Sequence, residues 1–274
     1  KDDPFSTYHI ENAGRSFQIP VHWHDEFEII YVRSGFLTVS ISGESYIGKT
    51  GDAFVVSPGN LHLMGSQTGT VDYYTFLFPL KYISFRTDDM LDEKLLEPLN
   101  SGHLMICPRV KDTAKELCEQ LIEIYEAKND ESVSKITTQV RTKIILLQFI
   151  LEMWKKGFVI ENDTSGRNTI EKEMVSYIQQ NFTGKISLRE FGEQFHLSEK
   201  YISRYFKEHF HITLSQYVTY LRLEHAKQLL QDTDIPVTDV AMQSGYQNVS
   251  YFIRSFQKAY AVSPLKYRKN NYSR

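Results

Sequence analysis

Residues 186–217 read ISLREFGEQFHLSEKYISRYFKEHFHITLSQY, and residues 235–267 read IPVTDVAMQSGYQNVSYFIRSFQKAYAVSPLKY. With an offset of 50 positions the two stretches match Tyr201 with Tyr251, Arg204 with Arg254, Phe206 with Phe256 and Tyr217 with Tyr267. A pattern that recurs at a fixed spacing is typical of one supersecondary unit used twice. This repeat decides the fold of the C-terminal part of the chain.

Each copy of the repeat predicts a helix, a tight turn and a second helix. In the first copy Ser187 and Glu190 have the spacing of a capping box, and Ser198 can cap the second helix. In the second copy Pro236 suits a helix start, where its missing N–H costs nothing, and Gly245 permits a positive φ in the turn. Both copies are therefore predicted to be helix-turn-helix units.

The second helix of such a unit enters the DNA major groove. Tyr201, Ile202, Tyr205 and Phe206 are predicted to form the inward face of the first of these helices. The side chains predicted to face DNA are Lys200, Ser203, Arg204 and Lys207 in the first helix and Val249, Ser250, Ile253, Arg254, Gln257 and Lys258 in the second. Arginine can bind guanine with two hydrogen bonds, worth about 1–3 kcal/mol of discrimination, whereas lysine suits phosphates. A single basic helix face is usually only solvated, but two faces with matched arginines favour DNA binding.

One helix over Thr213–Gln231 is predicted to join the two units, with Leu214, Tyr217, Leu221, His225 and Leu229 near one stripe. At ~1.5 Å per residue it is roughly 28 Å long, close to the ~34 Å of one DNA turn. One chain could therefore place both recognition helices on the same face of a duplex.

Residues 168–270 resemble the AraC/XylS family of regulators. The resemblance depends on the two units, on the stretch from Ile235 through Gly245 to Tyr246, and on residues 263–268, SPLKYR. It implies seven helices, two recognition helices and sequence-specific binding to promoter DNA. Carried over by position, it assigns DNA contacts to Lys200, Ser203, Arg204, Lys207, Asn248, Val249, Ser250 and Arg254. Gln257 departs from the family, in which a basic residue often stands at that position.

The charge is divided unevenly along the chain. Residues 168–274 hold 14 Lys and Arg against 10 Asp and Glu, a net +4, so the remaining residues carry 17 against 24, a net −7. A positive C-terminal domain on an acidic body indicates that only the C-terminal domain meets a polyanion.

The N-terminal half predicts a β domain over about residues 5–80. Strand-like segments at 26–32, 36–42 and 53–56 are separated by turn signals at Gly35, Gly43, Gly48 and Pro58-Gly59. Residues 161–168 contain no large apolar side chain, and residues 161–167 are predicted to be a linker. The predicted class is α+β: a cupin-like β-barrel with two helices in residues 1–160, then an all-α domain in 168–274.

The two helices are predicted from apolar stripes. Residues 111–127 place Ala114, Leu117, Cys118, Leu121, Ile124 and Tyr125 on one face, and residues 132–155 place Val133, Ile136, Val140, Ile144, Leu147, Leu151 and Trp154 at spacings of three and four. The second stripe is similar to a coiled coil. Two interpretations stay open: the helices cover the β domain, or they form the interface of a homodimer.

The β domain also carries two motifs that resemble those of cupins, over about residues 14–66. They are His22-x-His24-x3-Glu28-x6-Gly35 and Gly51-x6-Pro58-Gly59-x2-His62. On a strand His22, His24 and Glu28 share one parity, so with His62 they could form a site with three imidazoles and one carboxylate. The second motif departs from the pattern, because Pro58 and Gly59 are adjacent and no asparagine follows His62 at the usual spacing.

These residues are predicted to bind an effector, and a sugar is preferred to a metal. Small barrels hold a ligand at the mouth, and imidazole and carboxylate groups suit hydroxyls. Aromatic residues could stack on a sugar ring, and arginines could meet a charged effector. The predicted effector-binding residues are His22, His24, Glu28, His62, Trp23 and Arg33, with Phe17, Tyr31 and Arg15 as further candidates. No cofactor or metal is predicted.

The predicted function is a transcription regulator that binds promoter DNA as a homodimer under control of a small effector. Two other functions stay open: a metal-dependent cupin enzyme with a helical tail, and a DNA-binding protein that senses nothing. No nucleophile elbow, phosphate loop or CxxC pair favours an enzyme. The two cysteines, Cys107 and Cys118, are too few for a disulfide framework, and Cys118 is expected in a core. No apolar run reaches the length of a membrane span. These features fit the cytoplasm.

Overall fold

The computed structural model describes residues 4–12, 14, 16–66, 69–85, 89–127, 134–162, 169–210 and 212–272. The chain forms two compact units, Lys1–Thr169 and Ile170–Arg274. The predicted linker of residues 161–167 falls mostly on 163–168, which lie outside the described residues, as do Arg15 and Val133. No described helix is long and apolar enough to cross a bilayer.

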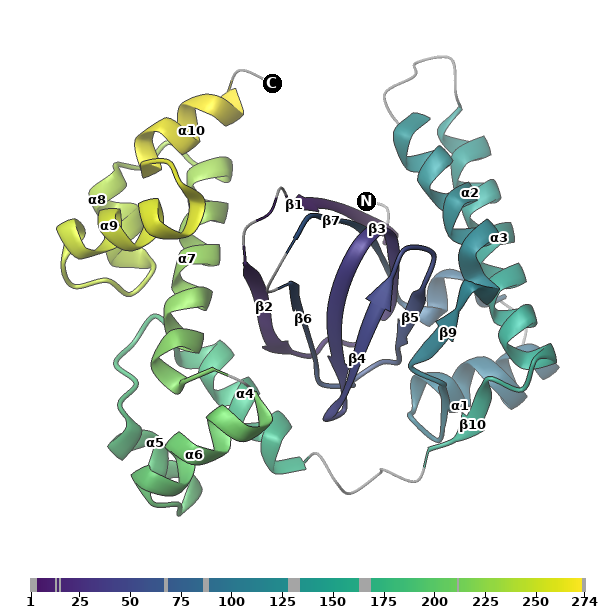
Figure 1. Cartoon of the computed structure of the whole chain (residues 1–274), viewed down its shortest axis with the longest axis horizontal. Helices are drawn as coiled ribbons and strands as arrows, with labels where there is room; N and C mark the ends of the chain where they lie inside the picture. Colours follow the sequence, from purple (N-terminus) through teal and green to yellow (C-terminus); the bar gives the residue numbers. More distant parts are fainter. Residues whose placement is uncertain are drawn as a thin grey trace. The chain divides into compact units, whose positions relative to one another are not determined.

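The N-terminal unit is built on two layers of antiparallel strands that share one long strand, β3 (Figure 1). Its strands are β1 (Ser6–Asn12), β2 (Phe17–His22), β3 (Phe27–Ile41), β4 (Glu44–Lys49), β5 (Ala53–Val56), β6 (His62–Ser66), β7 (Val71–Phe78), β8 (Leu104–Ile106), β9 (Arg109–Lys111) and β10 (Val159–Glu161). One layer has the order β1-β7-β3-β5-β9; in the other, β2 pairs with β6, and β3 pairs with both β6 and β4. Within the described residues this path does not close into a ring, so the predicted barrel is an open pair of layers. The predicted order, a β-rich domain followed by a helical domain, is confirmed.

Strand β3 passes from one layer to the other at Gly35, where the sequence predicted a break. Gly35 has a φ of +83°, and a Cβ atom there would lie 2.1 Å from the carbonyl oxygen of Thr70. A register shift between Val32 and Ser34 bends the strand at the same point. Glycine is therefore needed for close backbone approach, and the strand continues through it.

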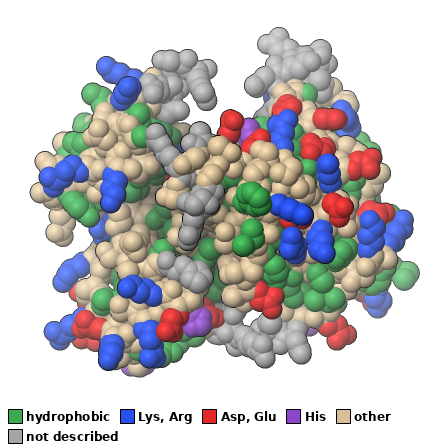
Figure 2. Space-filling view, viewed as in Figure 1, with side chains coloured by type: hydrophobic (Ala, Val, Ile, Leu, Met, Phe, Trp, Pro, Cys, Tyr) green, Lys and Arg blue, Asp and Glu red, His purple; other side chains and the backbone are tan. Residues whose placement is uncertain are grey.

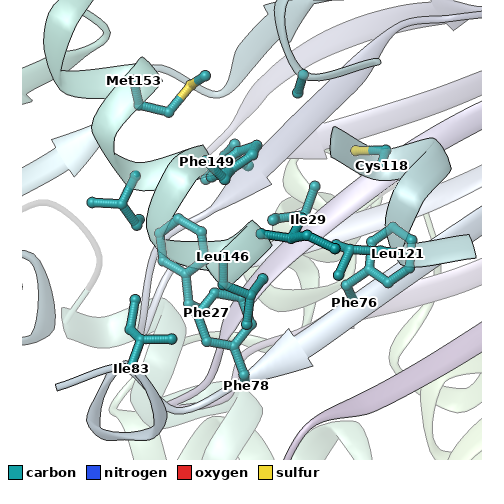
Figure 3. Close-up of a cluster of buried hydrophobic side chains, with 14 of the residues drawn as sticks. Phe27, Ile29, Phe76, Phe78, Ile83, Cys118, Leu121, Leu146, Phe149 and Met153 are labelled. Atoms are coloured by element: carbon teal, nitrogen blue, oxygen red, sulfur yellow. The ribbon is translucent and has the colours of Figure 1, made fainter. Parts of the chain in front are cut away.

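Residues of β3 alternate between two cores. Ile30 and Val32 belong to the cluster between the layers, and Phe27 and Ile29 to a cluster shared with the helices. In Figure 3 Phe27, Ile29, Phe76 and Phe78 meet Cys118, Leu121, Leu146, Phe149 and Met153. Full burial of such side chains stabilises the fold by about 1.5–3 kcal/mol each. The predicted core position of Cys118 is confirmed.

The helices of the N-terminal unit follow the strands. They are η1 (Leu80–Tyr82), η2 (Asp92–Leu96), α1 (Glu97–Asn100), η3 (Asp112–Ala114), α2 (Lys115–Glu126) and α3 (Lys135–Lys155). Helix α2 buries Cys118, Leu121, Ile122 and Ile124, close to the predicted stripe. Both helices cover the face of the layer that carries Phe27 and Ile29.

Helix α3 is apolar on two faces. Ile145, Leu146, Phe149, Ile150 and Met153 are buried against the sheet. The predicted stripe lies on another face, where its described members Ile136, Val140, Ile144, Leu151 and Trp154 are 47–74% exposed and Leu147 is partly buried. Hydrophobic side chains reach the surface near the lower end of α3 in Figure 2. Covering the sheet therefore uses a different set of residues from the coiled-coil-like stripe.

The C-terminal unit consists, within the described residues, of the seven expected helices. They are α4 (Thr169–Asn181), α5 (Leu188–Phe195), α6 (Glu199–His209), α7 (Leu214–Asp232), α8 (Val237–Gln243), α9 (Val249–Tyr260) and α10 (Pro264–Tyr272). The predicted capping box of Ser187 and Glu190 is present at the start of α5. Pro236 is the residue before α8, and Gly245 has a φ of +84°. The predicted helix-turn-helix units are confirmed.

Helix α7 joins the two helix-turn-helix units, but the face that it buries differs from the predicted one. Leu214 and Tyr217 are buried in its first part, whereas Leu223, Ala226 and Leu230 are buried in its second part. The last three belong to the core of the second unit. The stripe therefore changes phase along the helix, because each end packs against a different helix-turn-helix unit. The prediction of a single buried face from Leu214 to Leu229 was therefore wrong.

Candidate functional site

Helix α6 is fixed in the first helix-turn-helix unit by its cap and by two buried side chains. The Ser198 hydroxyl oxygen accepts a hydrogen bond from the Tyr201 backbone N–H at 3.2 Å. Ile202 and Phe206 are fully buried. Because these residues point into the unit, Arg204 and its basic neighbours point outward.

Helix α9 repeats this arrangement in the second unit. The Asn248 side-chain oxygen accepts a hydrogen bond from the Tyr251 backbone N–H at 2.9 Å, and Phe252 and Phe256 are fully buried. Arg254 is exposed, like its repeat partner Arg204. Asn248 therefore caps the helix with its oxygen, which leaves its amide N–H groups for a ligand.

The other predicted DNA contacts also lie on α6 and α9 or their caps. Lys200, Lys207, Ser250 and Lys258 are exposed, and Ser203 is half-buried. Val249 is partly buried and packs on the core of the second unit, so only part of its surface is available. Ile253, also expected outside, packs on the same core.

Weak local contacts hold Arg204. Its Nε atom lies 3.9 Å from a carboxylate oxygen of Glu208, and its guanidinium lies 5.7 Å from the centre of the Tyr201 ring. Exposed pairs at this distance contribute little to stability. The Arg204 side chain can therefore reorient toward a base at small cost.

Sequence reasoning missed two tyrosines on the recognition helices. Tyr201, which the helical pattern placed inward, is 39% exposed, and Tyr251 is 53% exposed. They occupy the same position in the two repeats. Tyrosine hydroxyls are common phosphate contacts, and the matched pair in the repeat was the signal that could have identified them.

Arg222 and Gly245 lock the two helix-turn-helix units together. Arg222 of α7 donates hydrogen bonds of 2.7 Å to the carbonyl oxygens of Phe182 and Gly184, in the loop after α4. The turn at Gly245 packs against this loop, since a Cβ atom there would lie 2.6 Å from the carbonyl oxygen of Thr183. Burial lowers the pKa of Arg222 from its ordinary value. The second unit is therefore seated directly on the first.

Two hollows adjoin this contact and bring the two recognition helices to a common surface. One, of about 490 Å³, is lined by Ser203 of α6, Tyr251 of α9 and residues of α7 between them. The other, of about 460 Å³, is lined by Asn248, Tyr251 and the loop after α4. Figure 1 shows α6 and α9 near opposite ends of α7. Arg222 and Tyr251 line both hollows, and α6 and α9 together border the larger one.

The N-terminal unit holds a second cluster, made by His22, His24, His62 and Glu28. One ligand nitrogen from each of the three imidazoles lies within 4.8 Å of the others. A carboxylate oxygen of Glu28 lies 3.3 Å from Nε2 of His24 and 3.0 Å from Nε2 of His62. The side chains of His62 and Glu28 are 0% and 4% exposed. The sequence grouped these residues correctly, although by the parity of a single strand.

Different elements position the four side chains. His22 ends β2 and pairs in register with His62 of β6, in one layer. Glu28 lies on the part of β3 that pairs with β5 and β7, in the other layer. His24 lies in the connection between β2 and β3. The cluster therefore sits where the two layers face each other.

The electrostatics of the cluster are dominated by burial and by the carboxylate. Burial lowers the pKa of His22 to about 3, and the nearby His62 lowers it as well. Burial alone would raise the pKa of Glu28, but close contacts with His24 and His62 outweigh it and hold that pKa below its usual range. Burial opposes protonation of His24, yet its contact with Glu28 raises the His24 pKa overall.

Arg33 and Tyr31, two further predicted effector residues, lie apart from this cluster. Arg33 lies on the opposite side of β3, where it donates hydrogen bonds of 3.1 Å to Tyr74 and to Glu126 of α2. Tyr31 on that same side donates to Glu119 of α2. Trp23 lies between His22 and His24 in sequence and is half-buried. Phe17 stacks on Tyr73, with 6.0 Å between ring centres.

Two protein families match the chain. Residues 4–139 match the AraC-like ligand binding domain, and residues 191–270 match a helix-turn-helix domain. The first match covers strands β1 to β9, helix α2 and the start of α3, and the second covers both recognition helices.

Curated relatives are similar along most of the chain. The HTH-type transcriptional regulator YdeC of Bacillus subtilis is 29% identical over 277 residues, covering 95% of this chain and 89% of the relative. The melibiose operon regulatory protein of Escherichia coli is 24% identical, with coverages of 90% and 83%. The transcriptional activator RhaS of Salmonella schwarzengrund is 24% identical, with coverages of 91% and 87%. All three are transcription regulators, which agrees with the predicted absence of an enzymatic role.

A solved structure shares the overall architecture. ToxT from Vibrio cholerae superposes with a TM-score of 0.52 at 14% identity, and the match covers 97% of this chain and 98% of that one. At this identity the likeness concerns the fold.

Proposed function

Because the chain belongs to the AraC family of DNA-binding transcription regulators, we propose that a sugar bound to its N-terminal domain controls promoter binding and that it acts as a homodimer. The DNA-binding role and the presence of a ligand-binding domain follow from the family matches. The observation that carries the DNA contacts is the pair of exposed arginines, Arg204 and Arg254, at equivalent positions of two capped helices.

We expect Arg204→Ala and Arg254→Ala each to weaken specific operator binding by about 1–3 kcal/mol, or roughly 5- to 150-fold. Each arginine would contact one guanine, so each variant should relax the preference at one base. The measurement is a binding titration of the full chain on an operator selected from random DNA, followed by titrations on single-base variants. Arg141→Ala, an exposed arginine on α3 outside the helical unit, is the control.

Parent-like binding of both variants to operator and to random DNA would refute this assignment. The lysines should behave differently. Loss of Lys207 or Lys258 should weaken all sequences alike and reduce the salt dependence of binding by about one ion per lysine.

A sugar effector is supported by two features. The melibiose operon regulatory protein is related along most of the chain, and its name connects it with a sugar operon. The cluster of His22, His24, His62 and Glu28 offers polar groups that suit hydroxyls, with Trp23 next to it in sequence as a stacking surface. Arg33 is the predicted residue for a charged effector and lies apart from this cluster.

The effector class is tested by thermal unfolding of the full chain with mono-, di- and trisaccharides, carboxylic acids and amino acids. A sugar present at one hundred times its Kd should stabilise the protein by about 2.7 kcal/mol. The same sugar should not stabilise Glu28→Gln. Stabilisation by a carboxylic acid alone would replace the sugar with another effector class, and no stabilisation by any compound would favour a regulator that senses nothing.

A homodimer is supported by the two apolar faces of α3. One face is already buried against the sheet, whereas Ile136, Val140, Ile144, Leu151 and Trp154 of the stripe are exposed and lie outside that core. Its spacings of three and four allow side chains of a second copy to interlock with it. Exposed apolar stripes of this kind mark interaction sites.

The two domains would be coupled through the dimer. A ligand shifts an equilibrium only when it binds one state more tightly than the other. We propose that the sugar favours one arrangement of the β domain and its helices, and thereby one spacing of the DNA-binding domains of the two protomers. We propose the cytoplasm as the place where the protein acts. This proposal is motivated by the shared core of α2, α3 and strand β3, because β3 also carries Glu28 of the cluster.

A further inference from the structure

We propose that His22, His24, His62 and Glu28 form a binding site for one divalent transition-metal ion. Three imidazole nitrogens with one carboxylate oxygen suit Zn²⁺, Fe²⁺, Co²⁺ or Ni²⁺, whereas Mg²⁺ and Ca²⁺ prefer oxygen ligands throughout. The inference rests on the cluster itself and does not depend on the proposed sugar.

The spacing of the nitrogens fits a common ion. Three points that lie within 4.8 Å of one another always share a centre no farther than about 2.8 Å from each, since 4.8 divided by √3 is 2.8. Metal–imidazole bonds are about 2.0–2.1 Å long. Each nitrogen therefore lies within about 0.8 Å of bonding distance, a shift that small rotations of the rings can supply.

The ring orientations direct the same nitrogen of each histidine to the centre. The Nδ1 atoms of His22, His24 and His62 lie 2.9, 3.0 and 2.9 Å from the backbone carbonyl oxygens of Pro20, Glu26 and Asn60. A carbonyl oxygen only accepts, so each Nδ1 carries its proton and donates. In the neutral ring the lone pair is then on Nε2. Backbone carbonyls that orient imidazoles in this way are typical of the outer shell of metal sites.

The carboxylate adds a fourth candidate ligand. One Glu28 oxygen lies 3.0 Å from Nε2 of His62 and 3.3 Å from Nε2 of His24. Two ligand atoms of one tetrahedral ion, each bonded at about 2.0–2.1 Å, are about 3.3–3.4 Å apart. The Glu28 oxygen is therefore placed where it can share an ion with these two imidazoles.

The site is also rigidly supported. His22 and His62 face each other across paired strands, and Glu28 follows the fully buried Phe27 on β3. A preformed arrangement of this kind needs little reorganisation when the ion binds.

The test is direct metal binding to the full chain after removal of metals with a chelator. Calorimetric titration with Zn²⁺ and with Co²⁺ should give one ion per chain, and bound Co²⁺ should show the visible absorption of a nitrogen-ligated ion. His24→Ala and Glu28→Gln should weaken binding at least 100-fold. His9→Ala, which removes a histidine paired with Asp72 outside the cluster, should bind like the parent.

His24 is chosen because it is half-buried, so its loss should disturb the core less than loss of His62. Thermal unfolding without metal checks that each variant is folded. The inference is overturned if the parent binds no ion tighter than about 1 mM, if the cluster variants bind like the parent, or if Mg²⁺ competes equally with Zn²⁺.

The proposed sugar is tested separately by repeating its thermal-shift titration on metal-free and metal-loaded protein. Metal binding without a sugar response would refute the sugar and leave the metal site. A sugar response in a protein that takes up no metal would refute the metal site and leave the sugar.

Discussion

Gly245→Ala is expected to weaken operator binding by about 100-fold or more. An alanine at a φ of +84° costs roughly 1–2 kcal/mol, and its methyl group would press on the backbone of Thr183 at 2.6 Å. Backbone cannot move aside as a flexible side chain can, so the turn must leave its seat on the loop after α4. The second recognition helix would then lose its fixed position relative to the first.

The same variant should lower the free energy of unfolding of the helical unit by about 2–4 kcal/mol, from backbone strain and overpacking together. Gly184→Ala is the matched control, because Gly184 lies in the same contact, has no positive φ and leaves 3.4 Å to the nearest carbonyl oxygen. Operator titrations and thermal unfolding measure both effects. A Gly245→Ala protein with parental stability and affinity would show that the two units are not locked at this point.

Ile144→Asp is expected to turn the dimer into a monomer and to weaken binding to a two-site operator by 10²- to 10⁴-fold. Ile144 is 50% exposed in the middle of the apolar stripe of α3, so a carboxylate is tolerated in the monomer but would be buried in the interface. Loss of the second protomer removes the gain that linked binding events provide.

Sedimentation velocity measures the mass, and titration on one-site and two-site operators measures the affinity. Gln139→Asp places the same charge on α3 at an exposed position off the stripe and should remain dimeric. The dimer assignment fails if Ile144→Asp keeps the parental mass, or if the parent itself is a monomer at micromolar concentration.

The helical half of the fold was predictable because its signals are local. Capping residues such as Ser187 and Ser198 and the positive φ of Gly245 depend on a few neighbours in sequence. The second copy of the repeat shows the same local pattern and so supports the interpretation of the first. The turn chemistry and the recognition helices were therefore identified before any tertiary contact was known.

What helical periodicity could not determine is which apolar face meets which partner. Helix α3 has two apolar faces, and the sequence emphasised the one from Ile136 to Trp154 that stays exposed. In α7 the buried face changes between Tyr217 and Leu223, because two separate cores contact it. Tyr201 was placed inward by its spacing, although it is exposed. These outcomes depend on packing between distant segments.

The sensor half illustrates the same difference. The four residues of the histidine and carboxylate cluster were identified from their motifs, but β3 continues through Gly35 because of a close contact with Thr70, far away in sequence. Arg33 was grouped with the cluster, yet the pleat of β3 turns it toward Glu126 of α2. Residue types alone do not establish a coordination sphere, and the backbone carbonyls that orient the three imidazoles are visible only in the fold.

Hydroxyl-radical footprinting of the full-length Ile144→Asp protein on its selected operator tests the central claim most directly. A single protomer should protect two patches about 10 base pairs apart on one face of the duplex. Arg204→Ala and Arg254→Ala in this background should each weaken a different patch. One protected patch, or two patches on opposite faces of the duplex, would contradict the claim that α7 holds two recognition helices for adjacent turns of DNA.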